Sequence, residues 1–148
     1  LPFVEEVPSW LPPAEEPREG ELAKKYPLVY IQYHDRRNVH TQHIDIPELE
    51  VVQSEPLLQM NPKDAKPRGL SHGDMVHVFN DRGDMKLRVF LTEGIVPGTV
   101  ATQSGWTPDH FIEGCYQNLT RMAINEAEES YSMTNSAFYD NLVEVEKA

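Results

Sequence analysis

The sequence contains a single cysteine, Cys115, among its 148 residues. One thiol cannot form an internal disulfide bond, and it excludes zinc or iron–sulfur sites built from several cysteines. Basic residues are also scarce, because 13 Lys and Arg stand against 24 Asp and Glu, a formal net charge of −11. This acidity argues against nucleic acid and against an anionic membrane surface as partners.

Long hydrophobic runs are missing as well, since no apolar stretch approaches the ~20 residues of a membrane span. The first residues, Leu1 to Glu6, carry neither the positive start nor the apolar centre of a signal peptide. A start of this kind indicates a segment cut from a longer protein, so the compartment cannot be read from the sequence. The length suits one domain with a single sizeable core.

Proline is unevenly distributed, with six of the twelve prolines within residues 1–27. Proline fixes φ and removes a backbone donor. Residues 1–25 are therefore expected to form an extended arm, followed by one domain at residues 26–148. Phe3 and Trp10 within the arm predict that it docks on a surface.

Short runs of β-branched and aromatic residues predict a mainly β fold with a few short helices. The expected strands are residues 28–33, 57–60, 75–80, 85–91, 99–103 and 142–146. Asn61 and Pro62 predict the start of a short helix. The hairpin turn at residues 81–84 is expected to hold Gly83 at a positive φ. Many short strands point to a barrel or a sandwich, and residues 120–129 fit a helix or a loop equally well.

Three histidines, His34, His40 and His43, fall within ten residues and could in principle ligate a metal. No helical spacing of acidic residues and histidine accompanies them, so the sequence favours polar loop histidines. The common nucleophile, phosphate-loop and zinc-protease motifs are absent. No self-contained catalytic centre is therefore predicted.

Residues 61–83 form the most distinctive stretch, read locally as a capped helix, a tight turn and a hairpin. The helix can present Asn61 and Asp64, and a carboxylate can accept two parallel N–H donors from a guanine edge. The competing interpretation is that Asn61 caps the helix and Asp64 completes the capping arrangement. Local spacing alone favours capping.

This stretch resembles the C-terminal molybdopterin-dinucleotide-binding domain of the dimethyl sulfoxide reductase family of molybdenum and tungsten oxidoreductases. The motif reads Asn-x-x-Asp-Ala from Asn61, Arg-Gly-Leu from Arg68, Gly-Asp-x-Val-x-Val from Gly73 and Asn-x-Arg-Gly from Asn80. Similar segments occur in the family's order at residues 26–28, 37–42, 95–100, 105–106, 114–120 and 143–148. The resemblance covers about residues 22–148.

The resemblance implies a six-stranded double-psi β-barrel that is the last domain of a larger catalytic subunit. It implies bis(molybdopterin guanine dinucleotide) with molybdenum or tungsten as the cofactor, whose metal ligand comes from elsewhere in the parent chain. The fragment itself would be inactive, because the cofactor carries the redox chemistry. The implied partners are the remaining domains of the parent subunit and, as an option, an iron–sulfur electron-transfer subunit, with no nucleic acid and no membrane contact.

The resemblance also assigns residues to the cofactor. Asp64, with Asn61, would face a guanine. His40, Thr41 and Gln42 would line the pterin or the diphosphate, and Thr41 replaces the family's commoner serine while keeping the hydroxyl.

Later segments add three further candidates. Asn118 would approach the cofactor from a late loop, and Gly105 and Trp106 would lie near the same cleft. No catalytic residue and no metal ligand is assigned to this chain.

A non-enzymatic alternative stays open, because double-psi barrels also serve as recognition or adaptor modules that bind a protein partner. Under this interpretation Asn61 and Asp64 only cap a helix, and residues 1–25 bind a partner. The length of the parent gene separates the two interpretations, since the enzyme needs several hundred upstream residues.

Overall fold

The computed structural model describes residues 13–121, 123–124, 136–137 and 141–148. The strands are β1 (Leu28–Tyr33), β2 (Leu57–Met60), β3 (Met75–Phe79), β4 (Asp84–Leu91), β5 (Thr99–Gln103), β6 (Glu113–Gly114), β7 (Ala123–Ile124), β8 (Ser136–Ala137) and β9 (Asn141–Lys147). The helices are α1 (Glu21–Lys25), α2 (Pro47–Glu50), α3 (Pro62–Ala65) and the 3₁₀ helices η1 (Lys66–Arg68), η2 (Pro108–His110) and η3 (Tyr116–Leu119). No helix within these ranges is both long and apolar enough to cross a membrane.

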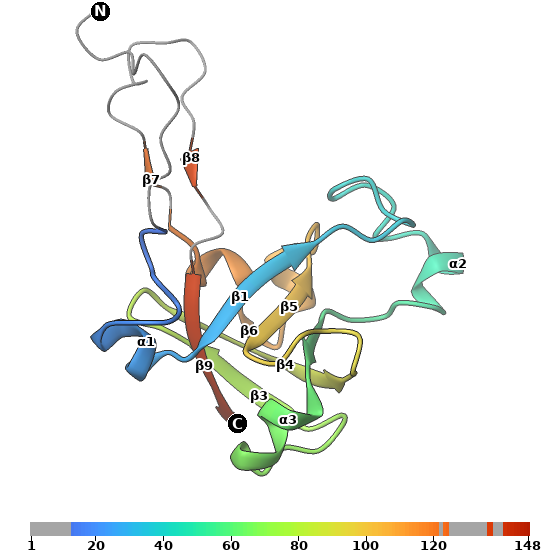
Figure 1. The fold of residues 1–148 in the computed structure, drawn as a ribbon. Coiled ribbons are helices and arrows are strands. Elements are labelled where there is room, and N and C mark those ends of the chain that lie inside the picture. The colour runs from blue at the N-terminus through green and yellow to red at the C-terminus, as the bar shows by residue number, and fades with distance from the viewer. Residues whose placement is uncertain (1–12, 122, 125–135, 138–140) are drawn as a thin grey trace, which may run out of the picture.

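Six strands form a closed barrel in the order β2-β5-β1-β9-β3-β4, and the pairing of β2 with β4 completes the ring. The pairs β1–β5 and β2–β4 are parallel, while the other four pairs in the ring are antiparallel. The short strand β6 pairs with β4 but is not part of the ring. The mainly β fold with a closed six-stranded barrel is therefore confirmed (Figure 1).

The core forms because alternate side chains on each strand point into the barrel. On β3, Val76 and Val78 are fully buried, whereas their neighbours are partly exposed. On β4, Met85, Leu87 and Val89 follow the same alternation. These apolar side chains supply the hydrophobic burial that stabilises a domain of this size.

The expected strands are present with shifts of at most one or two residues at their ends. The helix after Asn61 is also present, and Asn61 caps it by accepting a hydrogen bond from the amide of Lys63 at 2.9 Å. The prediction for Gly83 was wrong, because this residue does not have a positive φ. The glycine is required for close approach instead, since a Cβ there would lie 3.0 Å from the side chain of Asn118. The helix or loop expected at residues 120–129 falls mostly outside the described residues.

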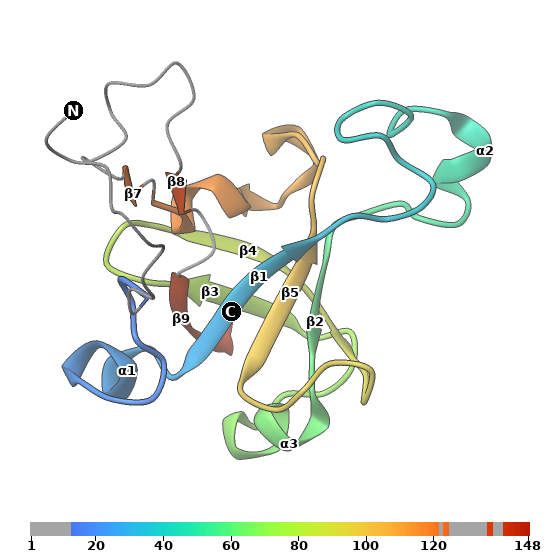
Figure 2. The ribbon, with the colours of Figure 1, turned by 45° about the horizontal axis from the view of Figure 1, so that its top comes forward.

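Two ends of the barrel differ in what they carry, as both ribbon views show (Figures 1 and 2). Because β1 and β5 run parallel, with Val29 opposite Thr99 and Tyr33 opposite Gln103, their carboxyl ends lie side by side. The long β1–β2 loop, residues 34–56, leaves the barrel at this end. Helix α3 lies at the opposite end, where β5 begins.

A buried carboxylate ties the N-terminal arm to the barrel. The Glu15 side chain is 3% exposed and pairs with the guanidinium of Arg82. It also accepts a hydrogen bond from the backbone N–H of Leu142 at 2.7 Å. Asn80 and Arg82 donate to the carbonyl oxygen of Leu119, each at 2.9 Å. We call this group of Glu15, Asn80 and Arg82 the Glu15 clamp.

The clamp joins the arm, the β3–β4 turn and the start of β9 at one point. Residues 21–25 of the expected arm form helix α1. Phe3 and Trp10, the residues expected to dock the arm, lie outside the described residues, so their docking stays a prediction.

Replacing Arg82 with Met should lower the free energy of unfolding by about 3–5 kcal/mol, because it leaves the Glu15 carboxylate buried without its cation. The double variant Glu15→Gln/Arg82→Met should lose less than Arg82→Met alone. Arg88→Met is the control, since Arg88 pairs with Glu55 at the surface and such pairs contribute ~0–1 kcal/mol. Urea unfolding measures all three, and equal losses for Arg82→Met and Arg88→Met would contradict the clamp.

His77 on β3 lies between two carboxylates from neighbouring strands. Its Nε2 is 2.8 Å from Asp84 on β4, and its Nδ1 is 3.1 Å from Glu146 on β9. Burial alone would lower the pKa of His77, but these hydrogen bonds and the two negative charges outweigh burial and raise it above 6.5. Lys86 is the cross-strand neighbour of His77 and is itself bound to Glu113.

A raised pKa in the folded state means that the His77 contribution to stability is complete below pH 6.5 and is lost as pH rises through the folded pKa. His77→Gln should therefore flatten the fall in unfolding free energy as pH rises above about 6.5. His72→Gln is the control, because His72 has no carboxylate partner among the described residues. An unchanged pH profile in His77→Gln would refute this role.

Candidate functional site

Along β1, the side chains that point into the barrel change from apolar at the start of the strand to polar at its carboxyl end. Leu28 and Tyr30 are buried in the core, and the alternation of a strand turns Gln32 and then His34 the same way. The inward positions thus leave the core and enter a polar cavity at this end of the barrel.

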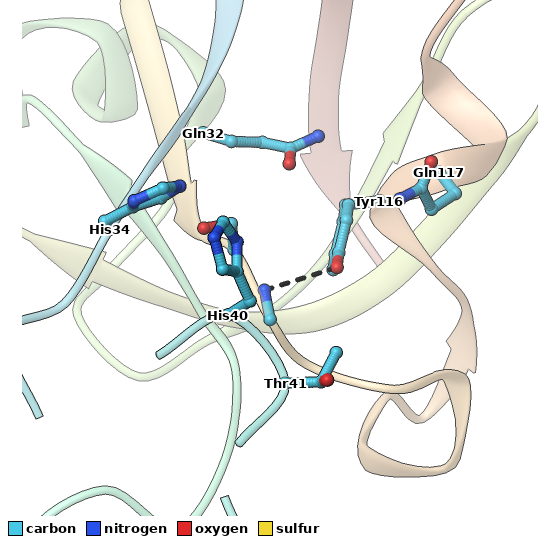
Figure 3. Close-up of a pocket in the computed structure, with 8 residues that line it drawn as sticks. Gln32, His34, His40, Thr41, Tyr116 and Gln117 are labelled. Atoms are coloured by element: carbon cyan, nitrogen blue, oxygen red, sulfur yellow. Dashed lines mark hydrogen bonds between the residues drawn. The ribbon is translucent and has the colours of Figure 1, made fainter. Parts of the chain in front are cut away.

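The cavity is a pocket of about 310 Å³ between the β1–β2 loop, the end of β5 and η3. Figure 3 shows the imidazoles of His34 and His40, the amide of Gln32 and the phenol of Tyr116 among the groups that line it. The lining residues are Gln32, His34, His40, Thr41, Ser104, Gly105, Tyr116 and Gln117.

A tight turn in the β1–β2 loop forms one wall of the pocket. The amide of Gln42 donates to the carbonyl oxygen of Val39 at 2.9 Å, which closes the turn over His40 and Thr41. His40 adopts a positive φ of 54°, an uncommon conformation for a residue with a Cβ. Its ring packs edge-on against His34, with 5.1 Å between ring centroids.

The second wall passes directly against this turn. Gly105 has a φ of 102°, and a Cβ there would overlap the carbonyl oxygen of His40. The Gly105 amide instead donates to the hydroxyl of Tyr116 at 3.3 Å, shown as the dashed line in Figure 3. Glycine is needed here both for the backbone conformation and for the close approach of the two loops.

Acidic side chains are absent from the pocket lining, although the chain holds 24 Asp and Glu. Asp35 follows His34, but the guanidinium of Arg37 binds both of its carboxylate oxygens at 2.7 Å. These hydrogen bonds lower the pKa of Asp35 to about 2. Hydroxyl, amide and imidazole groups therefore line the pocket, a set that suits an anionic or heterocyclic ligand.

The structure brings together three of the predicted cofactor residues, since His40, Thr41 and Gly105 all line the pocket. Gln42 belongs to the same turn but is not part of the lining. Trp106 is buried behind Gly105 against His110, with 5.0 Å between ring centroids. Its indole N–H is buried and has no hydrogen-bond acceptor among the described residues.

Asn118 lies next to the pocket residue Gln117 but binds elsewhere. Its amide donates to the carbonyl oxygen of Asp84 at 3.3 Å, and its oxygen faces the Cys115 thiol at 3.5 Å. Asn118 therefore holds η3 against the β3–β4 hairpin.

The structure does not bring Asn61 and Asp64 to the pocket. Asp64 Oδ2 accepts a hydrogen bond from the amide of Gly98 at 2.8 Å, at the start of β5. Ser104 lies six positions after Gly98, which places the pocket ~20 Å from this contact at ~3.3 Å per residue. Asn61 is buried, and its side chain binds Lys63 and the carbonyl oxygen of Ile95 at 2.7 Å. A guanine contact by these two residues stays a prediction.

Sequence reasoning missed five lining residues: Gln32, His34, Ser104, Tyr116 and Gln117. A usable signal existed for Gln32, which is a polar residue at an inward position of β1, and for His34, which follows two residues later, just beyond the end of the strand. Tyr116 and Gln117 gave no such signal, because only the folded chain brings η3 beside β1.

The histidine cluster does not form the metal site considered as an alternative. His34 and His40 pack together, but within the described residues no group of three or more His, Cys, Asp or Glu side chains could hold a metal ion.

The described residues thus form a closed six-stranded barrel with a polar, carboxylate-free pocket at one end. The family model described as "Molydopterin dinucleotide binding domain" matches residues 28–137. The chain belongs to this family of molybdopterin dinucleotide-binding domains.

Similar proteins support this assignment. A relative from Halobacterium salinarum, whose name describes a dimethyl sulfoxide reductase catalytic chain, is 39% identical over 126 residues, covering 85% of this chain and 14% of the relative. Dimethyl sulfoxide reductase DmsA of Haemophilus influenzae is 33% identical over 131 residues, covering 85% of this chain and 16% of the relative. The chain thus spans about a sixth or less of the length of these relatives.

A solved structure shares the fold. Acetylene hydratase from Pelobacter acetylenicus aligns with a TM-score of 0.72 and 20% sequence identity, over 96% of this chain and 21% of that chain.

Gly105→Ala should destabilise the domain more than Gly20→Ala. Both glycines have a φ of 102°, but a Cβ at Gly20 meets no atom within 4 Å, whereas a Cβ at Gly105 overlaps His40. The overlap should cost a further ~1–3 kcal/mol beyond the backbone strain that both variants share. Urea unfolding compares the pair, and equal losses would show that the two loops do not meet as described.

Proposed function

We propose that this domain binds bis(molybdopterin guanine dinucleotide) in the catalytic subunit of a molybdenum or tungsten oxidoreductase of the dimethyl sulfoxide reductase family. Family membership supports a molybdopterin dinucleotide as ligand. The single observation that carries the proposal is the carboxylate-free pocket at the carboxyl ends of β1 and β5. Its lining fits an anionic, heterocyclic cofactor.

The pocket residues would hold the pterin or the diphosphate. The hydroxyl of Thr41 can donate to a phosphate oxygen, and hydrogen bonds to charged groups are stronger than neutral ones. The hydroxyl of Ser104 already donates to the carbonyl oxygen of Tyr33 at 3.2 Å. The amides of Gln32 and Gln117 can donate and accept, as the edge of a pterin requires. The His40 turn sets the position of Thr41, and Gly105 packs closely against this turn because it has no Cβ.

The cofactor would supply the metal and the electron transfer, and this chain would bind and orient it. Reaction and substrate would be decided by the remaining part of the subunit. The proposed partners are the other domains of that subunit and an iron–sulfur electron-transfer subunit.

Asp64 is the proposed guanine contact. One of its oxygens binds the amide of Gly98, and the other has no hydrogen bond to a described residue. A carboxylate oxygen can accept the N–H groups of a guanine edge. Asn61 would act indirectly, since both ends of its side chain hold α3 and the loop at Ile95 in place.

Thr41→Val in the full-length subunit should weaken cofactor binding by about tenfold or more, because it removes a hydrogen bond to a charged group worth ~1.5–3 kcal/mol. Thr99→Val, at the other end of β5, is the matched control. The measurement is the content of molybdenum or tungsten and of guanine nucleotide per subunit after dialysis. Equal contents in both variants would count against the pocket as the cofactor site.

Asp64→Asn tests the guanine contact separately. An asparagine keeps an oxygen for the amide of Gly98 and replaces the other oxygen with an NH₂ group, which cannot accept a guanine N–H. Guanine nucleotide content should fall by about tenfold or more, while the urea midpoint changes little. Full nucleotide content together with a lower urea midpoint would leave Asp64 with a structural role only.

A further inference from the structure

The β1–β2 loop carries an exposed apolar surface outside the proposed cofactor site. We define its tip as residues 46–52, which include helix α2. Val51 is 88% exposed and Val52 is 64% exposed, and Ile46 is exposed beside them. Of the seven exposed large hydrophobic residues in the described part of the chain, three lie in this tip of seven residues. Such clustering marks an interaction surface rather than scattered surface residues.

The tip projects from the barrel in both ribbon views (Figures 1 and 2). Its base is fixed, because Ile44 is buried in the core and Gln53 binds the side chain of Gln103. His110 lies 3.6 Å from Asp45 at the same base. Within the tip, the amide of Leu49 donates to the carbonyl oxygen of Ile46 at 2.9 Å. The apolar surface is therefore held in a defined position, away from its own core.

The charged residues of the segment that carries this surface are all acidic. Residues 44–55 contain four acidic residues and no basic residue. Asp45 and Glu55 lie near His110 and Arg88 of this chain. Glu48 and Glu50, inside the tip, form no salt bridge with any described residue and are exposed. A complementary surface would be apolar at its centre and basic at its rim.

We propose that the tip docks on the remaining part of the parent catalytic subunit, at an apolar patch rimmed by lysine and arginine. This inference rests on the proposed function, which makes the chain one domain of a longer subunit. The relatives are six to seven times as long as the matched part, so most of the available protein surface lies outside this chain. A second copy of this chain fits less well, because two acidic tips would repel each other.

Hydroxyl-radical labelling of the full-length subunit tests the proposal, with a synthetic peptide of residues 44–55 as the uncovered reference. A docked state favoured by ~1.4 kcal/mol leaves the tip uncovered about a tenth of the time. Labelling of Val51 and Val52 should therefore be roughly tenfold lower in the subunit than in the peptide. Labelling equal to the peptide would overturn the proposal.

Charge reversal tests the basic rim. Glu48→Lys/Glu50→Lys should raise labelling of Val51 and Val52 toward the peptide level. Glu19→Lys/Glu93→Lys, which reverses two exposed acidic residues elsewhere, should leave it low. Low labelling of Val51 and Val52 that persists in Glu48→Lys/Glu50→Lys would overturn the basic rim. Labelling that rises when the subunit is diluted would show that a second copy covers the tip.

Metal and guanine nucleotide contents of the same samples separate this inference from the proposed function. A cofactor-loaded subunit with an unprotected tip overturns the docking alone. A protected tip in a subunit that never takes up the cofactor overturns the proposed function alone.

Discussion

The parallel pairing of β1 with β5 determines which end of the barrel carries the pocket and which end carries Asp64. Parallel strands bring equivalent ends together, so the loops that leave β1 and β5 meet at one end of the barrel. That meeting places the His40 turn against Gly105 and creates the polar pocket. The start of β5 consequently faces the other end, where Asp64 holds Gly98. An antiparallel pairing would separate the two walls of the pocket by the length of a strand.

The motif that identifies the family is largely a folding motif. Asn61 caps α3, Gly69 ends η1 in the left-handed region, and Asn80 and Arg82 form the Glu15 clamp. Arg68 binds Glu144 of β9 at 2.7 Å. Each of these residues holds a local backbone geometry in this chain, which is why the fold could be predicted from sequence. Family membership follows from them, but the position of the ligand does not.

The site was predictable only where local sequence decides it. His40 and Thr41 lie in one turn, and the family pattern predicted that they contact the cofactor. The structure shows that both line the pocket, and their contact with a cofactor stays a prediction. Tyr116 and Gln117 reach the pocket through tertiary packing, which leaves no periodic trace in the chain. Gly83 shows the same limit. A side chain there would collide with Asn118, which is 35 residues away, and the conformation of its own turn does not require glycine. Contacts across the barrel depend on the whole fold, so local sequence patterns do not predict them.

The place of β9 has a consequence for the order of folding during synthesis. This strand inserts between β1 and β3, and it binds Glu15, more than 120 residues earlier in the chain. The ring cannot close until the ribosome has passed residue 147, so β1 and β3 each wait with one edge unpaired. Strands in this state are open to wrong pairing with other chains. A newly made chain therefore exposes one edge of β1 and one edge of β3 until β9 has been synthesised.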